Sequence, residues 1–147
     1  MTIVKVIGVG LLGPALPDWP TAQTLLREPA SWQRQATVIS APSRLPAAER
    51  RRAGNVIKAS IAVADEALAA SGLPASDLAT VFTSSTGDPL NCHLLCEALA
   101  TAERMVSPTR FTNSVHNAAA GYWCIAAQSR QPSASLAAFD ASFAAGL

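Results

Sequence analysis

Charged residues are scarce in this chain of 147 residues: only 14% are Asp, Glu, Lys or Arg, and the formal net charge is +1. Binding to a phosphate backbone needs a concentrated basic surface, so this balance argues against nucleic acid as the main partner. The one basic run, Arg50-Arg51-Arg52, is typical of a solvated helix face, with an anion site as the alternative. Half of the residues are hydrophobic, which is typical of a globular chain, and the length fits one domain.

Cysteines and long apolar runs are also scarce. The three cysteines form neither a close-spaced metal pattern nor an even-numbered disulfide framework, which is typical of a reducing compartment. No apolar run reaches the roughly 18 residues that a membrane-spanning helix needs. Lys5 interrupts the apolar N-terminus, and no cleavage-site pattern follows it, so we expect no signal peptide. We therefore expect a cytoplasmic protein with no membrane span.

The N-terminus predicts a strand from Thr2 to Leu12, because its β-branched residues make it apolar on both faces, as in a covered sheet. Residues 8–13, with the sequence GVGLLG, have the spacing of a dinucleotide-binding fingerprint. Prolines 14, 17 and 20 prevent the helix whose N-terminus would meet the pyrophosphate. The glycines therefore indicate a tight turn, and we expect no cofactor.

Residues 14–45 are rich in proline and tryptophan and predict an irregular cover over the fold. One short helix is expected within them, at Thr21–Arg27. Trp19 and Trp32 are interpreted as packing anchors of this cover.

A long helix is expected next, from Pro46 to Ser71, because proline suits the first helical position and Gly72 suits the C-terminal stop. A second strand is expected over Leu78–Ser84. It leads through a loop at 84–89, rich in hydroxyls and glycine, into a helix from Leu90 to Ala102. Such a loop can cradle a phosphate, but it has no lysine, which argues against a nucleotide P-loop.

Cys92 and Cys96 lie one helical turn apart on the last of these helices, with His93 beside them. Two thiols and an imidazole suggest a metal site. However, His93 points about 100° away from Cys92, and no fourth ligand is near in sequence. We therefore interpret the two cysteines as small buried hydrophobic residues and predict no metal site.

The stretch 107–121 joins a proline-marked turn to a helix of small residues. Pro108 disfavours helical conformation at Ser107, so the chain should be extended there. A helix then begins near Asn113 or Ser114, because either side chain can cap it. Its body has no charge and several very small side chains, which would let another backbone approach closely. Such a helix is normally buried on most of its circumference.

The end of the chain predicts a third strand at 135–139, followed by a sharp turn and the start of a last helix at 140–147. Strands alternate with helices throughout the chain. This alternation predicts an α/β fold, layered as a sandwich, with a largely covered sheet.

Several segments carry a resemblance to a known family. They are residues 6–10 with Gly13-Pro14, the helix with Arg51-Arg52 and residues 64–73, residues 81–87, residues 107–121, and Asp140-Ala141-Ser142. In this order they resemble the N-terminal domain of β-ketoacyl synthases. The similarity is greatest to the chain-length-factor type subunits of type II polyketide and aryl polyene systems.

The resemblance implies a thiolase-like fold, in which two similar α/β halves pack together and two subunits pair through a shared sheet. Residues 1–147 would form the N-terminal half only, a mixed and mostly parallel sheet covered by helices, ending in the helix of the nucleophile elbow. Such a half would leave an apolar sheet and helix uncovered, and apolar patches of that size usually mark an interface.

Active members of this family use a cysteine at a turn between a strand and a buried helix, assisted by histidines, or a histidine and an asparagine, from the second half. In this chain either Ser142 or Phe143 occupies that position, depending on a one-residue choice of alignment, and no cysteine is there. Both histidines, His93 and His116, precede the elbow and do not match the second-half histidines. The resemblance therefore implies a subunit without a catalytic residue.

From this resemblance we expect a non-catalytic subunit that pairs with an active ketosynthase as a heterodimer and shapes its acyl tunnel, in fatty acid or type II polyketide biosynthesis. Acyl carrier protein is the second expected partner, with Arg51 and Arg52 as candidate contacts. The residues expected to line the interface or the tunnel are Asn117, Ala118, Ala119, Ala120, Gly121, Tyr122, Trp123 and Phe143. For each of them, simple core packing is the alternative.

Two other interpretations stay open. A strand–turn–helix also serves serine nucleophiles, so Ser142 could act in an acyl hydrolase or transferase, although the G-x-S-x-G pattern and a histidine after the serine are missing. The chain could also be a fragment of a longer, divergent β-ketoacyl synthase.

Overall fold

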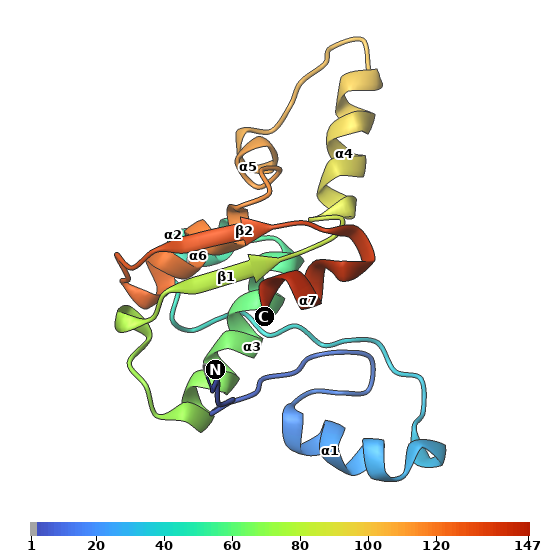
Figure 1. Cartoon of the computed structure of the whole chain (residues 1–147). Coiled ribbons are helices and arrows are strands. Elements are labelled where there is room, and N and C mark those ends of the chain that lie inside the picture. The colour runs from blue at the N-terminus through green and yellow to red at the C-terminus, as the bar shows by residue number, and fades with distance from the viewer. Residues whose placement is uncertain (1–2) are drawn as a thin grey trace.

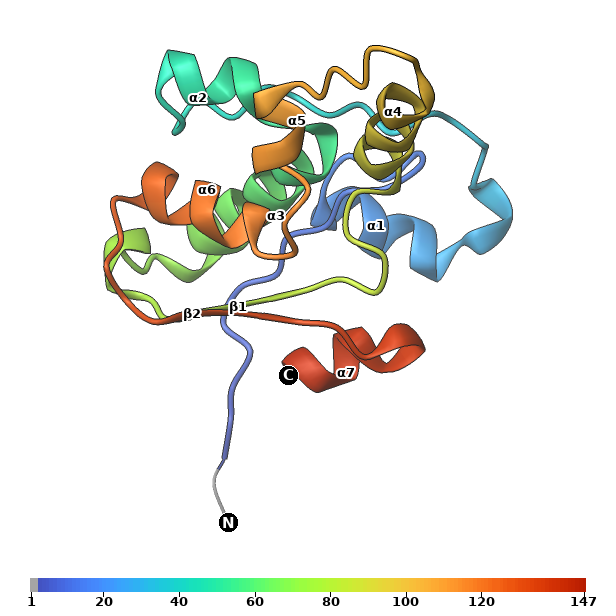
Figure 2. The ribbon, with the colours of Figure 1, turned by 90° about the horizontal axis from the view of Figure 1, so that it is seen from above.

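Two short parallel strands form the centre of the computed structural model, which describes residues 3–147 (Figure 1). β1 (Thr80–Thr83) pairs with β2 (Ser133–Leu136), with Val81 opposite Ala134. Seen from above, α3 (Asn55–Ser71) and α6 (Ala118–Ala127) cover one face of the strands, and α7 (Ser142–Gly146) lies on the other face (Figure 2). The layered α/β sandwich expected from the sequence is confirmed.

The remaining elements surround this centre. They are α1 (Trp19–Arg27), α2 (Ala47–Arg52), α4 (Pro89–Ala100), α5 (Pro108–Thr112) and three 3-10 turns at Pro29–Ser31, Ala75–Asp77 and Phe139–Ala141. Among the described residues, no helix is both long enough and apolar enough to cross a bilayer.

The hydrophobic core lies between α3 and α6. Ile57 and Ile61 of α3 meet Tyr122 and Trp123 of α6, and Leu45 closes the cluster from the preceding loop. Burying one such large side chain stabilises the fold by about 1.5–3 kcal/mol. The core therefore fixes the position of α6, whose N-terminal end carries most of the expected interface residues.

The strand expected at Thr2–Leu12 is wrong for the residues that the structure describes, since 3–12 form no strand, and Thr2 lies outside the described part. The segment runs instead along α3. A Cβ atom at Gly8 would overlap the carbonyl oxygen of Ala67, and one at Gly10 would overlap that of Val63. β-branched residues supply propensity only, and a strand also needs a partner strand. The two glycines serve close packing on a helix, and the tight turn follows at Gly13–Leu16.

The single helix expected at Pro46–Ser71 is also wrong, because Ala53 and Gly54 interrupt it between α2 and α3. Gly54 has the extended backbone of a helix N-cap (φ −71°, ψ 171°). Glycine is unfavourable inside a helix, so the break costs little there. The predicted stop is confirmed: Gly72 adopts the left-handed conformation at φ 70°, and its N–H donates to the Leu68 carbonyl.

The stretch before α6 contains a helix that the sequence did not predict. Ser107 is extended, as expected, and caps the short helix α5. α6 begins only at Ala118, so the expected start near Asn113 or Ser114 is wrong. Asn113 uses its side-chain amide to bond the Arg52 carbonyl, and the Ser114 hydroxyl donates to the Phe111 carbonyl. Because both side chains are engaged in these hydrogen bonds, neither of them caps α6.

The other predicted helices and strands differ from the observed ones mainly at their ends. α1 begins two residues before the predicted helix, because the Asp18 carboxylate accepts a hydrogen bond from the Thr21 N–H at 2.8 Å and caps it. The indole N–H of Trp32 donates to the Pro14 carbonyl at 3.2 Å, which connects the middle of the N-terminal cover to its start. β2 ends at Leu136, since Phe139 has φ +47° and breaks the strand predicted at 135–139.

Candidate functional site: the elbow turn and the face of α6

The elbow is the turn that leads from β2 into α7. Ser142 lies at its end and is 7% exposed. Its Oγ accepts a hydrogen bond from the Ala138 N–H at 3.0 Å and donates one to the Phe139 carbonyl at 2.6 Å. The serine hydroxyl thus closes the turn around a left-handed Phe139. Its one proton is already donated within the turn, which does not suit a nucleophile that must give its proton to a base.

Phe143 is the other candidate for the nucleophile position. Its side chain is 75% exposed, as are large parts of Phe139 before it and Leu147 one helical turn after it. α7 lies close to β1, because a Cβ atom at Gly146 would overlap the Thr83 side chain. The elbow therefore exposes aromatic and aliphatic side chains to its surroundings.

The expected interface residues on α6 divide into buried, half-buried and exposed groups. Tyr122 and Trp123 are buried in the hydrophobic core, and Ala120 is buried outside that cluster. Asn117 and Gly121 are exposed, and a Cβ atom at Gly121 would meet no atom within 4 Å. The close backbone approach expected for this helix is therefore absent at Gly121.

A cavity of about 490 Å³ lies beside the exposed side of α6. Asn117, Gly121 and Cys124 line it from α6, and Ser133 and Ser135 line it from β2. Ala118 and Ala119 are half-buried and line a second cavity of about 130 Å³ between α3, β1 and α6. Phe143 lies apart from these α6 residues, because α7 is on the opposite face of the sheet (Figure 2).

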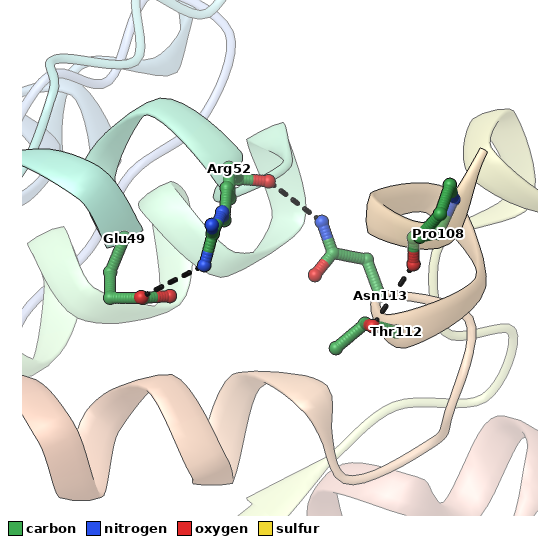
Figure 3. Close-up of polar contacts among 5 residues, drawn as sticks. All are labelled: Glu49, Arg52, Pro108, Thr112 and Asn113. Carbon is green, nitrogen blue, oxygen red and sulfur yellow. Dashed lines mark hydrogen bonds and ion pairs between the residues drawn. The ribbon is translucent and has the colours of Figure 1, made fainter.

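The two arginines expected to meet a carrier protein lie in the last turn of α2, and both are exposed. The Arg52 guanidinium pairs with the Glu49 carboxylate at 3.3 Å. Its backbone carbonyl accepts a hydrogen bond from the Asn113 amide at 2.8 Å, which connects α2 to the segment before α6 (Figure 3). α2 is thereby held next to the segment that leads into α6.

The same region contains the one tyrosine of the chain. Burial raises the pKa of Tyr122, and the nearby Glu49 carboxylate raises it further, whereas Arg52 and a hydrogen bond to Asn113 act in the opposite direction. Within the described residues, Asn113 Oδ1 has no hydrogen-bond partner in standard geometry, so its bond to the phenol is weak. Burial is the largest of these effects, so the pKa of Tyr122 is raised and the neutral phenol is favoured.

The cysteines and histidines are not gathered into a metal site. Cys92 and Cys96 are both exposed on α4, so the expectation that they are buried is wrong. Their helix lies at the edge of the fold (Figure 1). His93 pairs with Glu97 at 3.4 Å. Within residues 3–147, no group of three or more His, Cys, Asp or Glu side chains could hold a metal ion.

The fold and the elbow together define the class of protein. Parallel strands with helices on both faces, the second strand leading through a turn into a helix, form the layered α/β arrangement of the ketosynthase N-terminal domain. The family model for the β-ketoacyl synthase N-terminal domain matches residues 19–147, and the chain belongs to that family.

A solved structure has the same fold. A chain of the complex described as a ketosynthase (ApeO) with its chain length factor (ApeC), from Xenorhabdus doucetiae, matches with a TM-score of 0.75 at 24% sequence identity. The match covers 94% of the present chain and 56% of that chain, so the present chain spans a little more than half of its length. No curated protein matches the sequence.

The sequence did not reveal the hydrogen bond from the Asn113 amide to the Arg52 carbonyl. Nor did it reveal the two hydrogen bonds of the Ser142 hydroxyl within the elbow turn. Asn113 was considered only as a helix cap, because its partner, the Arg52 carbonyl, is 61 residues away. The local sequence gives an indication of the Ser142 hydrogen bond, because a serine hydroxyl in a turn can donate to the carbonyl three residues earlier. The Ser142 hydroxyl donates to the Phe139 carbonyl in this way.

Proposed function

We propose that this protein is a non-catalytic, chain-length-factor type subunit that pairs with an active β-ketoacyl synthase in fatty acid or type II polyketide biosynthesis, including aryl polyene synthesis, and shapes the acyl tunnel. The observation that carries the proposal is the chemistry of the elbow. The position of the family's cysteine holds Ser142, whose hydroxyl is engaged in the turn, or Phe143, which has no nucleophile.

The three cysteines support this reading. Cys92 and Cys96 are on α4, and Cys124 is on α6, so none of them stands between β2 and α7. The Ser142 hydrolase receives no support from the geometry, because the hydroxyl already donates to the Phe139 carbonyl. The condensation chemistry would therefore belong to the partner subunit.

The exposed side of α6 is the proposed part of the tunnel or the interface. Asn117 and Gly121 border a cavity there, whereas Tyr122 and Trp123 support the helix from within the core. In this proposal, Tyr122 and Trp123 fix the position of α6. Asn117 and Gly121 determine how much space is left for the acyl chain or the partner subunit. Phe143 would contact its partner from the other face of the sheet.

Arg51 and Arg52 are the proposed contact for acyl carrier protein. Both are exposed in the last turn of α2, and Arg50 adds a third positive charge to that turn. An acidic carrier surface would be attracted to this cluster, mostly through a faster association rate.

Native mass spectrometry tests the proposal most directly. The chain is co-expressed with the ketosynthase encoded nearest to it, and the intact assembly is weighed. We expect a one-to-one or two-to-two complex. A monomer that is unaffected by the ketosynthase would contradict the proposed function.

A further inference from the structure

α2 carries the basic turn that is proposed to meet the carrier protein, yet the helix has no core contact of its own. It is six residues long, and none of these six residues is buried. A helix this short is only marginally stable in water, so contacts with the rest of the fold must keep it ordered. Two such contacts flank it, because Leu45 before α2 and Ala53 after it are buried in the hydrophobic core. The order of α2 therefore comes from its neighbours.

The last turn of α2 has a third contact, which comes from the Asn113 side chain (Figure 3). Arg52 is the last residue of the helix, and the carbonyl groups at a helix end have no partner within the helix. The Asn113 amide donates to the Arg52 carbonyl at 2.8 Å. Asn113 is 7% exposed, so a buried amide takes the place of the water that would otherwise bind this end of α2.

Asn113 is itself held at the end of α5. Its backbone N–H donates to the Thr109 carbonyl at 3.1 Å. The hydroxyl of the neighbouring Thr112 donates to the Pro108 carbonyl at 3.0 Å (Figure 3). The amide that reaches α2 therefore starts from an ordered backbone.

Tyr122 shows that the end of α2 lies close to α6. Burial is the main cause of the raised pKa of its phenol, and Glu49, Arg52 and Asn113 are near enough to shift this pKa as well. The basic turn of α2 is thus placed against the core helix at the point where Asn113 bonds it.

We propose that Asn113 is a positioning residue for binding of the acyl carrier protein: its amide holds the last turn of α2 in the conformation that presents Arg51 and Arg52. The inference rests on the proposed function for the identity of the partner. A cluster of charges that is already ordered loses less conformational entropy on binding than a frayed one. Removing the Asn113 amide should therefore weaken carrier binding although every positive charge stays in the chain.

Binding of the carrier protein to the full chain tests this role. The acyl carrier protein encoded nearest to the chain is labelled with a fluorophore, and its anisotropy is measured as the chain is added, at several salt concentrations. The chain is used without the ketosynthase, so that a carrier site on the ketosynthase does not contribute. We expect Asn113→Ala to weaken binding roughly fivefold, which is the order of one intramolecular hydrogen bond. Asn113→Ser removes the same amide and is used if Asn113→Ala does not fold.

Two further variants separate positioning from charge and from stability. Arg51→Ala removes a positive charge, so binding should weaken and its salt dependence should become smaller. Asn113→Ala keeps all charges, so its salt dependence should stay that of the parent. Glu66→Gln is the control for stability, because Glu66 bonds the N-terminal segment and not α2. It should bind the carrier like the parent, at a temperature where circular dichroism shows every variant to be folded.

The outcomes separate the inference from the proposed function. If Arg51→Ala weakens binding and Asn113→Ala does not, the positioning role is wrong and the proposed function stands. If the parent does not bind the carrier, or Arg51→Ala binds as tightly as the parent, the proposed carrier contact fails and the inference fails with it. If Glu66→Gln weakens binding as much as Asn113→Ala, the effect is a general loss of stability, and the positioning role is wrong as well.

Hydrogen exchange gives a second measurement on the same variants. The Ala53 N–H donates to the Glu49 carbonyl at 2.9 Å, so exchange in the peptide 46–54 reports the order of the last turn of α2. We expect this peptide to exchange roughly fivefold faster in Asn113→Ala than in the parent, with Glu66→Gln unchanged. Equal exchange rates in Asn113→Ala and the parent would overturn the positioning role.

Discussion

The Glu66 carboxylate accepts a hydrogen bond from the backbone N–H of Trp19 at 2.6 Å, and its second oxygen accepts one from the Leu11 N–H at 2.7 Å. One side chain of α3 thus holds both ends of the turn between residues 11 and 19. These bonds are the clearest connection between the N-terminal segment and the helical layer.

Replacing this carboxylate should loosen the N-terminal segment. Glu66→Gln keeps one oxygen acceptor and loses the other, so we expect a loss of about 1.5–3 kcal/mol in the free energy of unfolding, as for a hydrogen bond to a charged group. Urea unfolding followed by circular dichroism measures it. Glu28→Gln, at an exposed position, is the matched control and should unfold at the same urea concentration as the parent. An unchanged midpoint for Glu66→Gln would show that water replaces the carboxylate.

Removing the Asn113 side chain should separate α2 from the segment before α6. Asn113→Ala leaves the Arg52 carbonyl without its donor, and we expect a loss of about 1–3 kcal/mol in stability. Asn117→Ala is the control, because Asn117 is exposed and its side chain makes no cap hydrogen bond to α6. Thermal unfolding of the two variants gives the comparison. Equal melting temperatures would mean that the link carries no stability.

The raised pKa of Tyr122 has a direct optical test, because the chain contains one tyrosine. Tyrosinate absorbance in the folded protein should titrate above the ordinary value of 10.0, and in denaturant it should return to that value. The folded state holds the neutral phenol, so this stability is complete below the unfolded pKa and is lost as the pH rises through the folded pKa. Tyr122→Phe should remove this part of the alkaline pH dependence. A folded titration at or below the ordinary value would contradict the effect of burial.

Ser142 is predicted to act in the turn and not in catalysis. Ser142→Ala should lower stability by about 1–2 kcal/mol, because it removes two hydrogen bonds from the elbow. Product formation by the complex, measured at a temperature where the variant is folded, should stay at the parent level. Ser135→Ala is the control: within the described residues its buried hydroxyl has no partner, so its loss should not destabilise. Loss of product with an intact complex would support a catalytic serine.

Enlarging Gly121 tests whether α6 borders the acyl tunnel. A Cβ atom at this position meets open space, so Gly121→Leu should fold. If α6 borders the tunnel, the added side chain takes up space there, and we expect shorter products from the reconstituted complex. Ala70→Leu, near the exposed end of α3, should leave product length unchanged. Unchanged products from an intact Gly121→Leu complex would exclude this helix from the tunnel.

The sequence predicted the order of the elements well where the pattern was local. Gly72 stops α3 because it acts through its own backbone angles, and the helix predicted from Leu90 begins one residue earlier, at Pro89. The resemblance to ketosynthases also anticipated the fold, since it depended on several segments in order. What it could not give was the local conformation of those segments.

The wrong predictions share one physical cause, which is a partner distant in sequence. Residues 3–12 have strand propensity, but they pack on α3 through Gly8 and Gly10. Cys92 was expected to be buried because cysteine usually is, and exposure depends on which element covers α4. Among the candidate site residues, the two hydrogen bonds of the Ser142 hydroxyl could not be predicted, because they depend on the left-handed backbone of Phe139.

The parallel pairing of the two strands also has a consequence for the order of folding. Thr80 faces Ser133, so the sheet joins residues that are 53 positions apart in sequence, with α4, α5 and α6 between them. Contacts between residues so far apart form late, because the entropy of loop closure must be lost before they contribute. During synthesis, β2 leaves the ribosome after the helices that it helps to order. Until then, α3 and α6 have no sheet beneath them, and the nascent chain exposes the apolar face that the finished protein encloses.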